Sequence, residues 1–170
     1  MKTILLIVYI SLLLTVHLVN AQETPWWESW DNKYQEVDIS LLLEQEQRYA
    51  DSIEKDPGAA QFYTRQKGYR FKGTFTGKWR DLSDERRDVM KLTYKIFTGE
   101  NPIFDQTQKE VQIQTGDHLI WMPIQAVLEK DFKKEIKNGK DVYLYTLYFN
   151  HHKQDGTLYN IFFISEFRKL

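Results

Sequence analysis

The sequence predicts a mainly β domain of the α+β class that follows a helical N-terminal segment. From Gly68 onward, apolar residues alternate with polar ones at a spacing of two, which is typical of a half-buried strand. Several further strand-like runs follow, and glycine, asparagine and proline residues separate them as turn signals do. Two other stretches, Asp38 to Lys55 and Pro123 to Ile136, repeat their apolar residues at helical spacing.

Residues 1–21 are expected to form a secretory signal peptide that does not belong to the folded domain. Lys2 precedes an apolar run, and Val19-Asn20-Ala21 fits a small-residue cleavage site, so the exported chain would begin at Gln22. The apolar run is shorter than the roughly 20 residues that a membrane-spanning helix needs, although an uncleaved membrane anchor is the alternative. We therefore expect a secreted or periplasmic protein of bacterial type, with no transmembrane segment after signal cleavage.

The 170-residue chain has no cysteine and a formal net charge of −1. Small exported domains often depend on disulfides, so their absence predicts an apolar core large enough to hold the fold unaided. A zinc site with thiolate ligands is excluded, and no other metal or cofactor is expected. Residues 22–67 are net acidic and residues 68–170 are slightly basic. Because strong polyanion binders carry a much larger basic excess, duplex DNA is not expected as a partner.

Residues 22–67 are predicted to form a helical segment in front of the main domain. Asp38 can cap a helix that runs to Lys55, because its side chain can accept from the free N–H groups of the first turn. The apolar stripe of this helix consists of Leu42, Tyr49 and Ile53. A short second helix is predicted from Ala59 to Gln66. We expect the first helix to lie over part of the main domain and to cover apolar surface there.

Three tryptophans, Trp26, Trp27 and Trp30, precede this helix. Clustered tryptophans in short exported segments can stack on sugars, and they can also pack onto the domain that follows. The sequence leaves both interpretations open.

The main domain, residues 68–170, is predicted to contain five strands and one helix. Gly73 and Gly77 lie on the apolar phase of the first strand, where glycine often marks a bulge or a bend. A helix that starts near Pro123 separates the third strand from the fourth, and Leu128, Phe132 and Ile136 form its buried stripe. The predicted strands start at Gly68, run from Val89 to Thr98, from Glu110 to Met122 with an internal turn or bulge at Gly116-Asp117, from Asp141 to Asn150, and from Thr157 to Phe167.

This order of three strands, a helix and two strands resembles the OB-fold, a five-stranded Greek-key barrel with its helix between the third and fourth strands. The resemblance covers Gly68 to Leu170 and is one of architecture, without a family motif. Its most telling part is Pro123 to Tyr145, where a capped helix leads through Asn138-Gly139-Lys140 into a strand. A cystatin-like or SH3-like α+β sheet is the rival fold, and the long helix from Asp38 to Lys55 suits the cystatin-like version.

The sequence carries no recognisable catalytic motif. It has no G-x-S-x-G serine, no H-E-x-x-H zinc motif, no P-loop and no dinucleotide-binding fingerprint. His151 and His152 would face opposite sides of a strand and could not easily share a metal, whereas in a loop they could. A small hydrolase with an unrecognised site remains one alternative, but non-enzymatic binding is the preferred interpretation.

The resemblance implies a ligand site on the second and third strands and on the adjoining loops. The charged connection between the first two predicted strands adds Arg80, Arg86 and Arg87, next to carboxylates that can neutralise them. The candidate ligand-binding residues are Arg70, Lys72, Lys78, Lys91, Lys95, Tyr143, Tyr145, His151, His152 and Lys153. Cationic groups interleaved with aromatic rings suit single-stranded nucleic acid, an anionic glycan or an acidic peptide.

The expected function is thus that of an exported binding module whose partner is an unknown protein, peptide or anionic ligand, with a protein or peptide slightly preferred. The second alternative is a structural or assembly protein of the cell envelope, for which an oligomer is possible.

Overall fold

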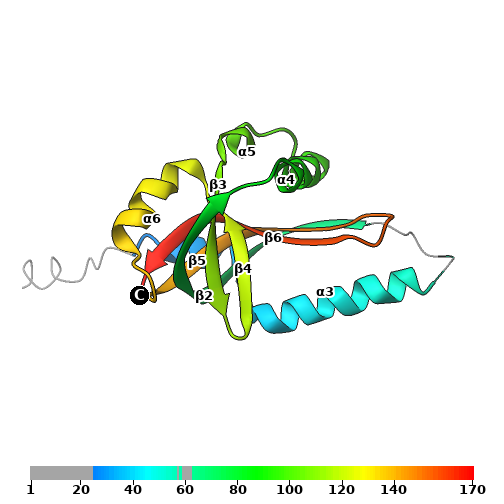
Figure 1. The fold of residues 1–170 in the computed structure, drawn as a ribbon, viewed down its shortest axis with the longest axis horizontal. Coiled ribbons are helices and arrows are strands. Elements are labelled where there is room, and N and C mark those ends of the chain that lie inside the picture. Colours follow the sequence, from blue (N-terminus) through cyan, green and yellow to red (C-terminus); the bar gives the residue numbers. More distant parts are fainter. Residues whose placement is uncertain (1–24, 57, 59–62) are drawn as a thin grey trace, which may run out of the picture.

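A computed structural model describes residues 25–56, 58 and 63–170, so the predicted signal peptide lies outside the described residues. The structure is mainly β in an α+β arrangement, with a six-stranded sheet that is not closed and helices on both of its sides (Figure 1). The strands are β1 (Gln35–Glu36), β2 (Tyr63–Asp81), β3 (Lys109–Thr115), β4 (His118–Pro123), β5 (Asp141–His152) and β6 (Leu158–Lys169). The helices are α2 (Glu28–Asp31), α3 (Ile39–Glu54), α4 (Asp84–Phe97), α5 (Ile103–Gln106), the 3-10 turn η1 (Ala126–Leu128) and α6 (Glu129–Glu135). Among the described residues, no helix is long and apolar enough to cross a membrane.

The long strand β2 organises the sheet, whose order is β4-β3-β2-β5-β6. It pairs in antiparallel fashion with β5 from Tyr63 to Thr74 and with β3 from Thr74 to Asp81, and β1 pairs with it in parallel. Its register with β3 shifts between Phe75 and Trp79, and Gly77 in between has a positive φ of 79°. The bulge predicted from the glycines is therefore confirmed, and it lies where β2 leaves β5 and continues along β3.

Apolar residues fill both faces of the sheet. The main core lies on the α3 side and contains residues from every strand of the β4-β3-β2-β5-β6 path together with α3 and α6. A second cluster lies between α4, α5 and the other face of β5 and β6. Because successive strand residues point to opposite faces, the runs of β5 and β6 that are apolar on both phases are explained by cover on both sides.

Helix α3 is confirmed as predicted, including its cap. Asp38 Oδ1 accepts a hydrogen bond from the Leu41 backbone N–H at 3.1 Å. Ile39 and Leu42 belong to the main core, whereas Tyr49 of the predicted stripe is 41% exposed. The helix therefore packs against the sheet on a face that is rotated slightly from the predicted one.

The prediction of a strand from Val89 to Thr98 is wrong, because this segment belongs to helix α4. Ser83 caps the helix, and its hydroxyl accepts from the Arg86 N–H at 3.4 Å. Val89, Met90 and Thr93 recur at helical spacing and are buried. The residues assigned to the inner face of a strand include Leu92 and Ile96, which are 49% and 57% exposed. The capping signal and acidic first turn outweigh the local alternation of polar and apolar residues.

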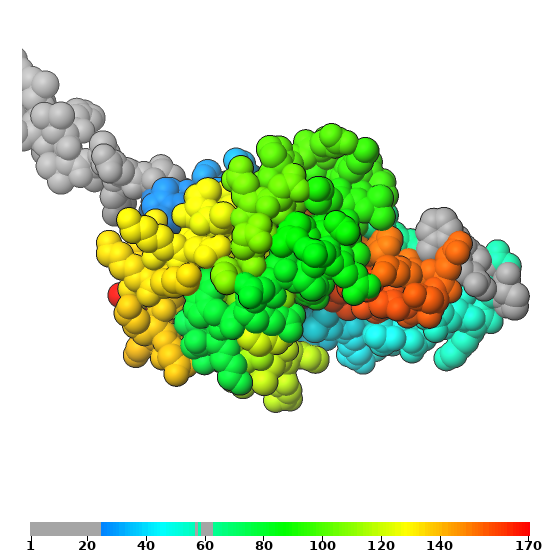
Figure 2. All heavy atoms as spheres, turned by 45° about the horizontal axis from the view of Figure 1, so that its top comes forward, coloured from blue at the N-terminus to red at the C-terminus, as the bar shows by residue number. Residues whose placement is uncertain are grey.

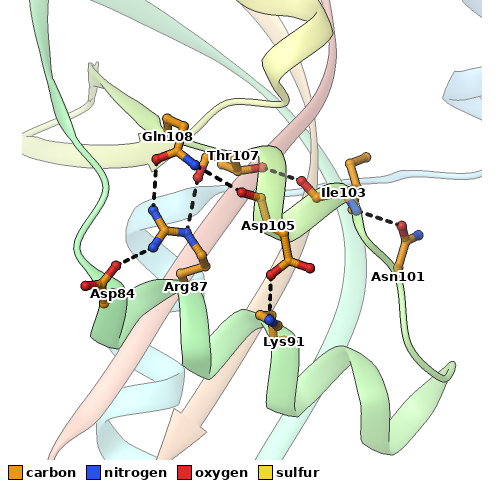
Figure 3. A network of polar contacts seen from close by, with 8 residues as sticks. All are labelled: Asp84, Arg87, Lys91, Asn101, Ile103, Asp105, Thr107 and Gln108. Carbon is orange, nitrogen blue, oxygen red and sulfur yellow. Dashed lines mark hydrogen bonds and ion pairs between the residues drawn. The ribbon is translucent and has the colours of Figure 1, made fainter.

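A network of polar contacts holds the α5 segment against α4 (Figure 3). The Arg87 guanidinium pairs with Asp84 within α4 and donates to the Thr107 carbonyl at 3.3 Å and to Gln108 Oε1 at 3.4 Å. Lys91 of α4 forms an ion pair with Asp105 at 2.5 Å. Through these contacts, the connection between β2 and β3 forms a helical layer that covers one face of the sheet.

Three smaller boundaries differ from the predictions. Tyr63 to Gln66 are the start of β2, so they are not helical, while 59–62 lie outside the described residues. The region from Glu110 to Met122 is a hairpin of two strands that turns at Gly116-Asp117, as the glycine indicated. Pro123 ends β4 instead of starting the helix. The described residues form six strands where five were predicted, because the strand predicted in α4 is lost while the second strand of this hairpin and the short β1 are added.

The Gly73→Ala substitution should destabilise the sheet, because a Cβ atom at this position would lie 2.4 Å from Ile113 Cγ2. We expect the free energy of unfolding to fall by about 1–3 kcal/mol, as in other overpacked cores. Urea unfolding of the single variants and of Gly73→Ala combined with Ile113→Ala measures it. The cost of Gly73→Ala should shrink in the Ile113→Ala background, and equal costs in both backgrounds would contradict the steric explanation.

The Ile39→Ala substitution should lower the free energy of unfolding by roughly 2–4 kcal/mol, because Ile39 is buried in the main core. Leu41→Ala on the same helix is the matched control, since Leu41 is 49% exposed and should change stability by no more than about 0.5 kcal/mol. Thermal or urea unfolding measures both variants. Similar losses for the two would mean that α3 does not pack against the sheet on this face.

Candidate functional site

The two edge strands β4 and β6 approach each other and leave a pocket between them. They are joined by a parallel bridge between Ile124 and Ile164, and the Gln125 N–H donates to the Ile164 carbonyl at 3.2 Å. A pocket of about 300 Å³ lies along this seam. We call it the seam pocket; its lining residues are Leu43, Arg80, Arg86, His118, Leu119, Ile120, Trp121, Asn160 and Phe162.

Two arginines meet one buried carboxylate at this pocket. Glu110 is fully buried, and its Oε2 and Oε1 atoms accept from Arg80 Nε at 2.6 Å and from Arg86 Nε at 2.8 Å. Arg80 and Glu110 are cross-strand partners in β2 and β3, whereas Arg86 comes from the first turn of α4. The pair of guanidinium groups exceeds the single carboxylate by one positive charge.

The indole of Trp121 completes the cationic side of the seam pocket. The Arg80 guanidinium lies 4.4 Å from the centre of its ring, and Arg86 Nη2 donates to the Trp121 carbonyl at 3.0 Å. Cation–π stacking and the bond to the carbonyl hold both guanidinium groups in place. The excess positive charge therefore lies beside an aromatic surface at a fixed position.

The opposite side of the seam pocket is apolar. Leu43 of α3 and Ile120 of β4 are partly buried and pack against the main core, and Phe162 of β6 is fully buried. The pocket thus gives a ligand access to the edge of the main core. The volume lies at the lower end of the range of roughly 300–1,000 Å³ that is usual for small-molecule pockets.

Asn160 adds an oriented amide to this surface. Its Oδ1 atom accepts from the Tyr148 hydroxyl at 2.5 Å and from Asn150 Nδ2 at 2.8 Å, which directs the oxygen into the sheet interior. Burial raises the pKa of Tyr148, so this hydroxyl keeps its proton and remains a donor. The amide nitrogen of Asn160 is left as the group that can donate to a ligand in the pocket.

Three predicted site residues, Arg70, Tyr143 and Tyr145, lie together, but the chain itself covers them. Arg70 donates to the Tyr143 hydroxyl at 3.0 Å and to the Tyr34 carbonyl at 2.8 Å. The Tyr145 hydroxyl donates to Asp31 at 2.8 Å, and Tyr145 is fully buried. This part of the predicted surface is therefore filled by residues 25–36.

The tryptophans belong to the same cover. Trp30 lies with its ring centre 5.8 Å from that of Tyr145, and the Arg168 guanidinium lies 4.9 Å from the Trp27 ring. Two of the three tryptophans thus pack onto the sheet, which is one of the two interpretations that the sequence left open. Trp26 remains half exposed.

Four of the five predicted lysines do not share one surface. Lys72 forms an ion pair with Asp141 at 2.8 Å on the neighbouring strand, and Lys78 is exposed at the bulge of β2. Lys91 lies on α4, paired with Asp105 as described above, and Lys95 lies on the same helix in an ion pair with Glu100 at 2.7 Å. The expectation that Lys91 and Lys95 extend the polar face of a second strand is corrected, because that strand is a helix.

The remaining predicted residues, His151, His152 and Lys153, lie at the β5–β6 hairpin. His152 is buried, contacts Glu54 Oε1 at 2.8 Å and stacks on the Tyr63 ring. His151 lies beside Tyr159, and burial lowers the pKa of its imidazole. The two histidines thus face opposite sides of the sheet, as expected for a strand. Within the part of the chain that the structure describes, no cluster of three or more His, Asp or Glu residues could hold a metal.

Lys153 ties this hairpin to α4. Its ammonium donates to Glu85 at 3.0 Å and to the Tyr159 hydroxyl at 3.2 Å. Figure 2 shows the α4 region in green next to the orange hairpin. The basic character of this loop is therefore used in packing the hairpin against α4.

Sequence reasoning singled out Arg80 and Arg86 but missed their partners Glu110 and Trp121. The charged connection that contains Asp84 and Glu85 offered nearer carboxylates for these arginines. Glu110 and Trp121 lie on the faces of β3 and β4 that are turned away from the main core, and the hairpin turn was the signal that these strands would be neighbours. No feature of the sequence pointed to Asn160 as a site residue.

The sequence matches no protein-family model, and comparisons with curated proteins and with solved structures find no significant similarity.

Proposed function

We propose that the protein is an exported, non-enzymatic binding module of OB-like architecture, and that the seam pocket receives an acidic, partly apolar group of a protein or peptide partner. The observation that carries the proposal is the juxtaposition of the Arg80–Arg86–Glu110 cluster with an apolar surface in one pocket. The net positive charge attracts a carboxylate, and the apolar side accepts the aliphatic part that bears it.

The OB-like part of the proposal is supported by connectivity. The main strands follow one another as β2, β3, β4, a helix, β5 and β6, with α4 and α5 inserted between β2 and β3. The strand order and the parallel bridge between the β4 and β6 ends agree with such an arrangement. In OB-folds the second and third strands and the loop after the first strand form the usual ligand surface. The seam pocket shares two of these parts, since Arg86 lies in the connection after β2 and His118 to Trp121 lie in β4, whereas its other side comes from α3 and β6.

A protein or peptide suits this pocket better than the other anionic ligands. A single excess charge gives little attraction for a phosphate backbone, whose binding depends on many cationic contacts. The apolar side formed with Leu43, Ile120 and Phe162 suits an aliphatic group better than a hydroxyl-rich sugar. Export supports the same preference, because nucleic acids are uncommon ligands outside the cytoplasm.

Hexanoate is a suitable probe, because it joins a carboxylate to a short aliphatic chain. We expect it to shift the amide signals of Leu43, Trp121 and Asn160 and to bind about tenfold more tightly than hexanol, since only hexanoate can pair with the guanidinium groups. Added salt should weaken the binding of hexanoate and leave the binding of hexanol unchanged. Equal binding of the two probes, or shifts away from the seam pocket, would contradict the proposal. Parallel titrations with an acidic peptide, an acidic oligosaccharide and a single-stranded oligonucleotide identify the class of ligand.

Arg80→Gln tests the charge directly. The side-chain amide can still donate to Glu110, and Arg86 remains in place, so we expect a folded protein that binds hexanoate about tenfold more weakly. Arg48→Gln is the matched control, because Arg48 is an exposed arginine of α3 that pairs with Glu44. Calorimetric titration measures both variants. If Arg80→Gln and Arg48→Gln bind hexanoate equally well, the seam pocket does not use its cationic side.

A further inference from the structure

One stretch of β2 has a free edge, at a different place from the seam pocket. On one edge β2 pairs with β5 from Tyr63 to Thr74. On the other edge β3 pairs from Thr74 onward, and β1 pairs with Tyr69 and Arg70. Among the residues that the structure describes, none pairs with Tyr63 to Gly68 on this second edge. The N-terminal part of β2 is therefore an edge strand.

On the free edge, the backbone N–H and C=O groups of every second residue point outward. The Val37 N–H donates to the Arg70 carbonyl at 3.1 Å, so the backbone of Arg70 faces the β1 side. The Thr146 hydroxyl donates to the Tyr69 carbonyl at 3.1 Å, so the backbone of Tyr69 faces β5. Because this direction alternates along a strand, the N–H and C=O groups of Thr64 and Gln66 face the free edge. Moreover, β1 already extends the same edge as an added strand.

A groove follows this edge between two helices. Its volume is about 370 Å³, and both faces of the sheet contribute to it, so it surrounds the edge itself. Glu46 of α3 borders it on one face, and Phe97 at the end of α4 borders it on the other. Phe97 is 52% exposed although it is a large apolar residue. The groove is lined by Glu46, Thr64, Arg65, Gln66, Lys67, Tyr69, Phe97 and Tyr148.

The charges on the α3 side of the groove select the type of strand that fits. Glu46 is buried and pairs with Arg65, with Arg65 Nη1 at 3.0 Å from Oε1, so the two cations Arg65 and Lys67 lie beside a single carboxylate and leave one excess positive charge. Lys67 is exposed, and its ammonium lies 5.4 Å from the centre of the Tyr69 ring. Its positive charge favours an acidic side chain on an added strand. A second copy of this chain, paired in antiparallel fashion about Gln66, would instead place Lys67 opposite Arg65 and bring like charges together.

We propose that the free edge of β2 from Tyr63 to Gly68 binds an extended segment of a partner protein in which acidic residues flank an apolar one. The backbone of the segment pairs with Thr64 and Gln66, its acidic side chains face Arg65 and Lys67, and its apolar side chain covers Phe97. This is recognition by strand addition, in which backbone bonds supply affinity and the alternating side chains supply specificity. It is independent of the seam pocket, which lies between other strands.

The first test is a charge exchange on the purified protein. A short peptide of alternating glutamate and valine should shift the amide signals of Thr64, Gln66 and Gly68, whereas a lysine–valine peptide should not. Lys67→Glu should weaken binding of the glutamate peptide by about tenfold and should allow the lysine peptide to bind. Lys78→Glu, an exposed lysine farther along the same strand, is the matched control and should change neither. Shifts elsewhere, or equal effects of the two variants, would overturn the proposal.

The second test removes one backbone donor. Gln66→Pro deletes the N–H that faces the free edge and spares the ladder to β5, which is the situation in which edge strands tolerate proline. Gln66→Ala loses the same side-chain bond to Thr98 but keeps the N–H. We expect Gln66→Ala to bind the glutamate peptide and Gln66→Pro to lose it, with hexanoate binding unchanged in both. Equal peptide binding by the two variants would overturn the proposal, as would a concentration-dependent mass that disappears in Gln66→Pro, because that result assigns the edge to a second copy.

Discussion

The change of partner along β2 is the constraint on which the rest of the structure depends. A strand of 19 residues is too long to pair with one neighbour in so small a sheet, so β2 pairs first with β5 and then with β3. The bend at Gly73 and Gly77 makes this possible, because backbone lies close to Ile113 at the first position and takes a positive φ at the second. It also brings β4 and β6, the outer strands of the two halves, near enough to be bridged at Ile124 and Ile164. The seam pocket exists because this bridge joins only one part of the two strands.

The second general feature is that basic side chains on the surface form ion pairs with carboxylates of the same chain. Arg70 meets Asp31 and Glu36, Lys91 meets Asp105, and Lys153 meets Glu85. Most of the exposed pairs add little to stability, but they remove the positive charge that the sequence offers as a ligand surface. The pairs of Arg70 join the acidic N-terminal segment to the main domain, whereas the other two pairs lie within the main domain. The charge that remains for a ligand lies around Glu110, which two arginines share, and at Lys67, which is exposed beside the Arg65–Glu46 pair.

Local signals were enough to predict the parts of the fold that depend on local geometry. The cap at Asp38, the bulge at Gly77 and the turn at Gly116-Asp117 each follow from the backbone conformation that one residue prefers. The segment from Val89 to Thr98 was mispredicted because its residues alternate as in a strand, whereas the cap that decides its structure lies outside it, at Ser83. The candidate site was predicted only in part, since strand pairing that no single segment reveals brings Glu110 and Trp121 to the arginines and Asn160 to the same pocket.

The pairing of Tyr63 with His152 also has a consequence for how the chain folds. Most of the β2–β5 ladder joins residues that are far apart in the sequence, so this contact closes a very long loop. During synthesis, β2, α4 and the β3–β4 hairpin emerge before β5 does. Until β5 is made, part of the main core is therefore uncovered and one edge of β2 lacks its principal partner. The central strand of the finished sheet is thus an exposed edge while the later strands are still being made. The arginines and lysines along it also help to keep that edge from pairing with other chains.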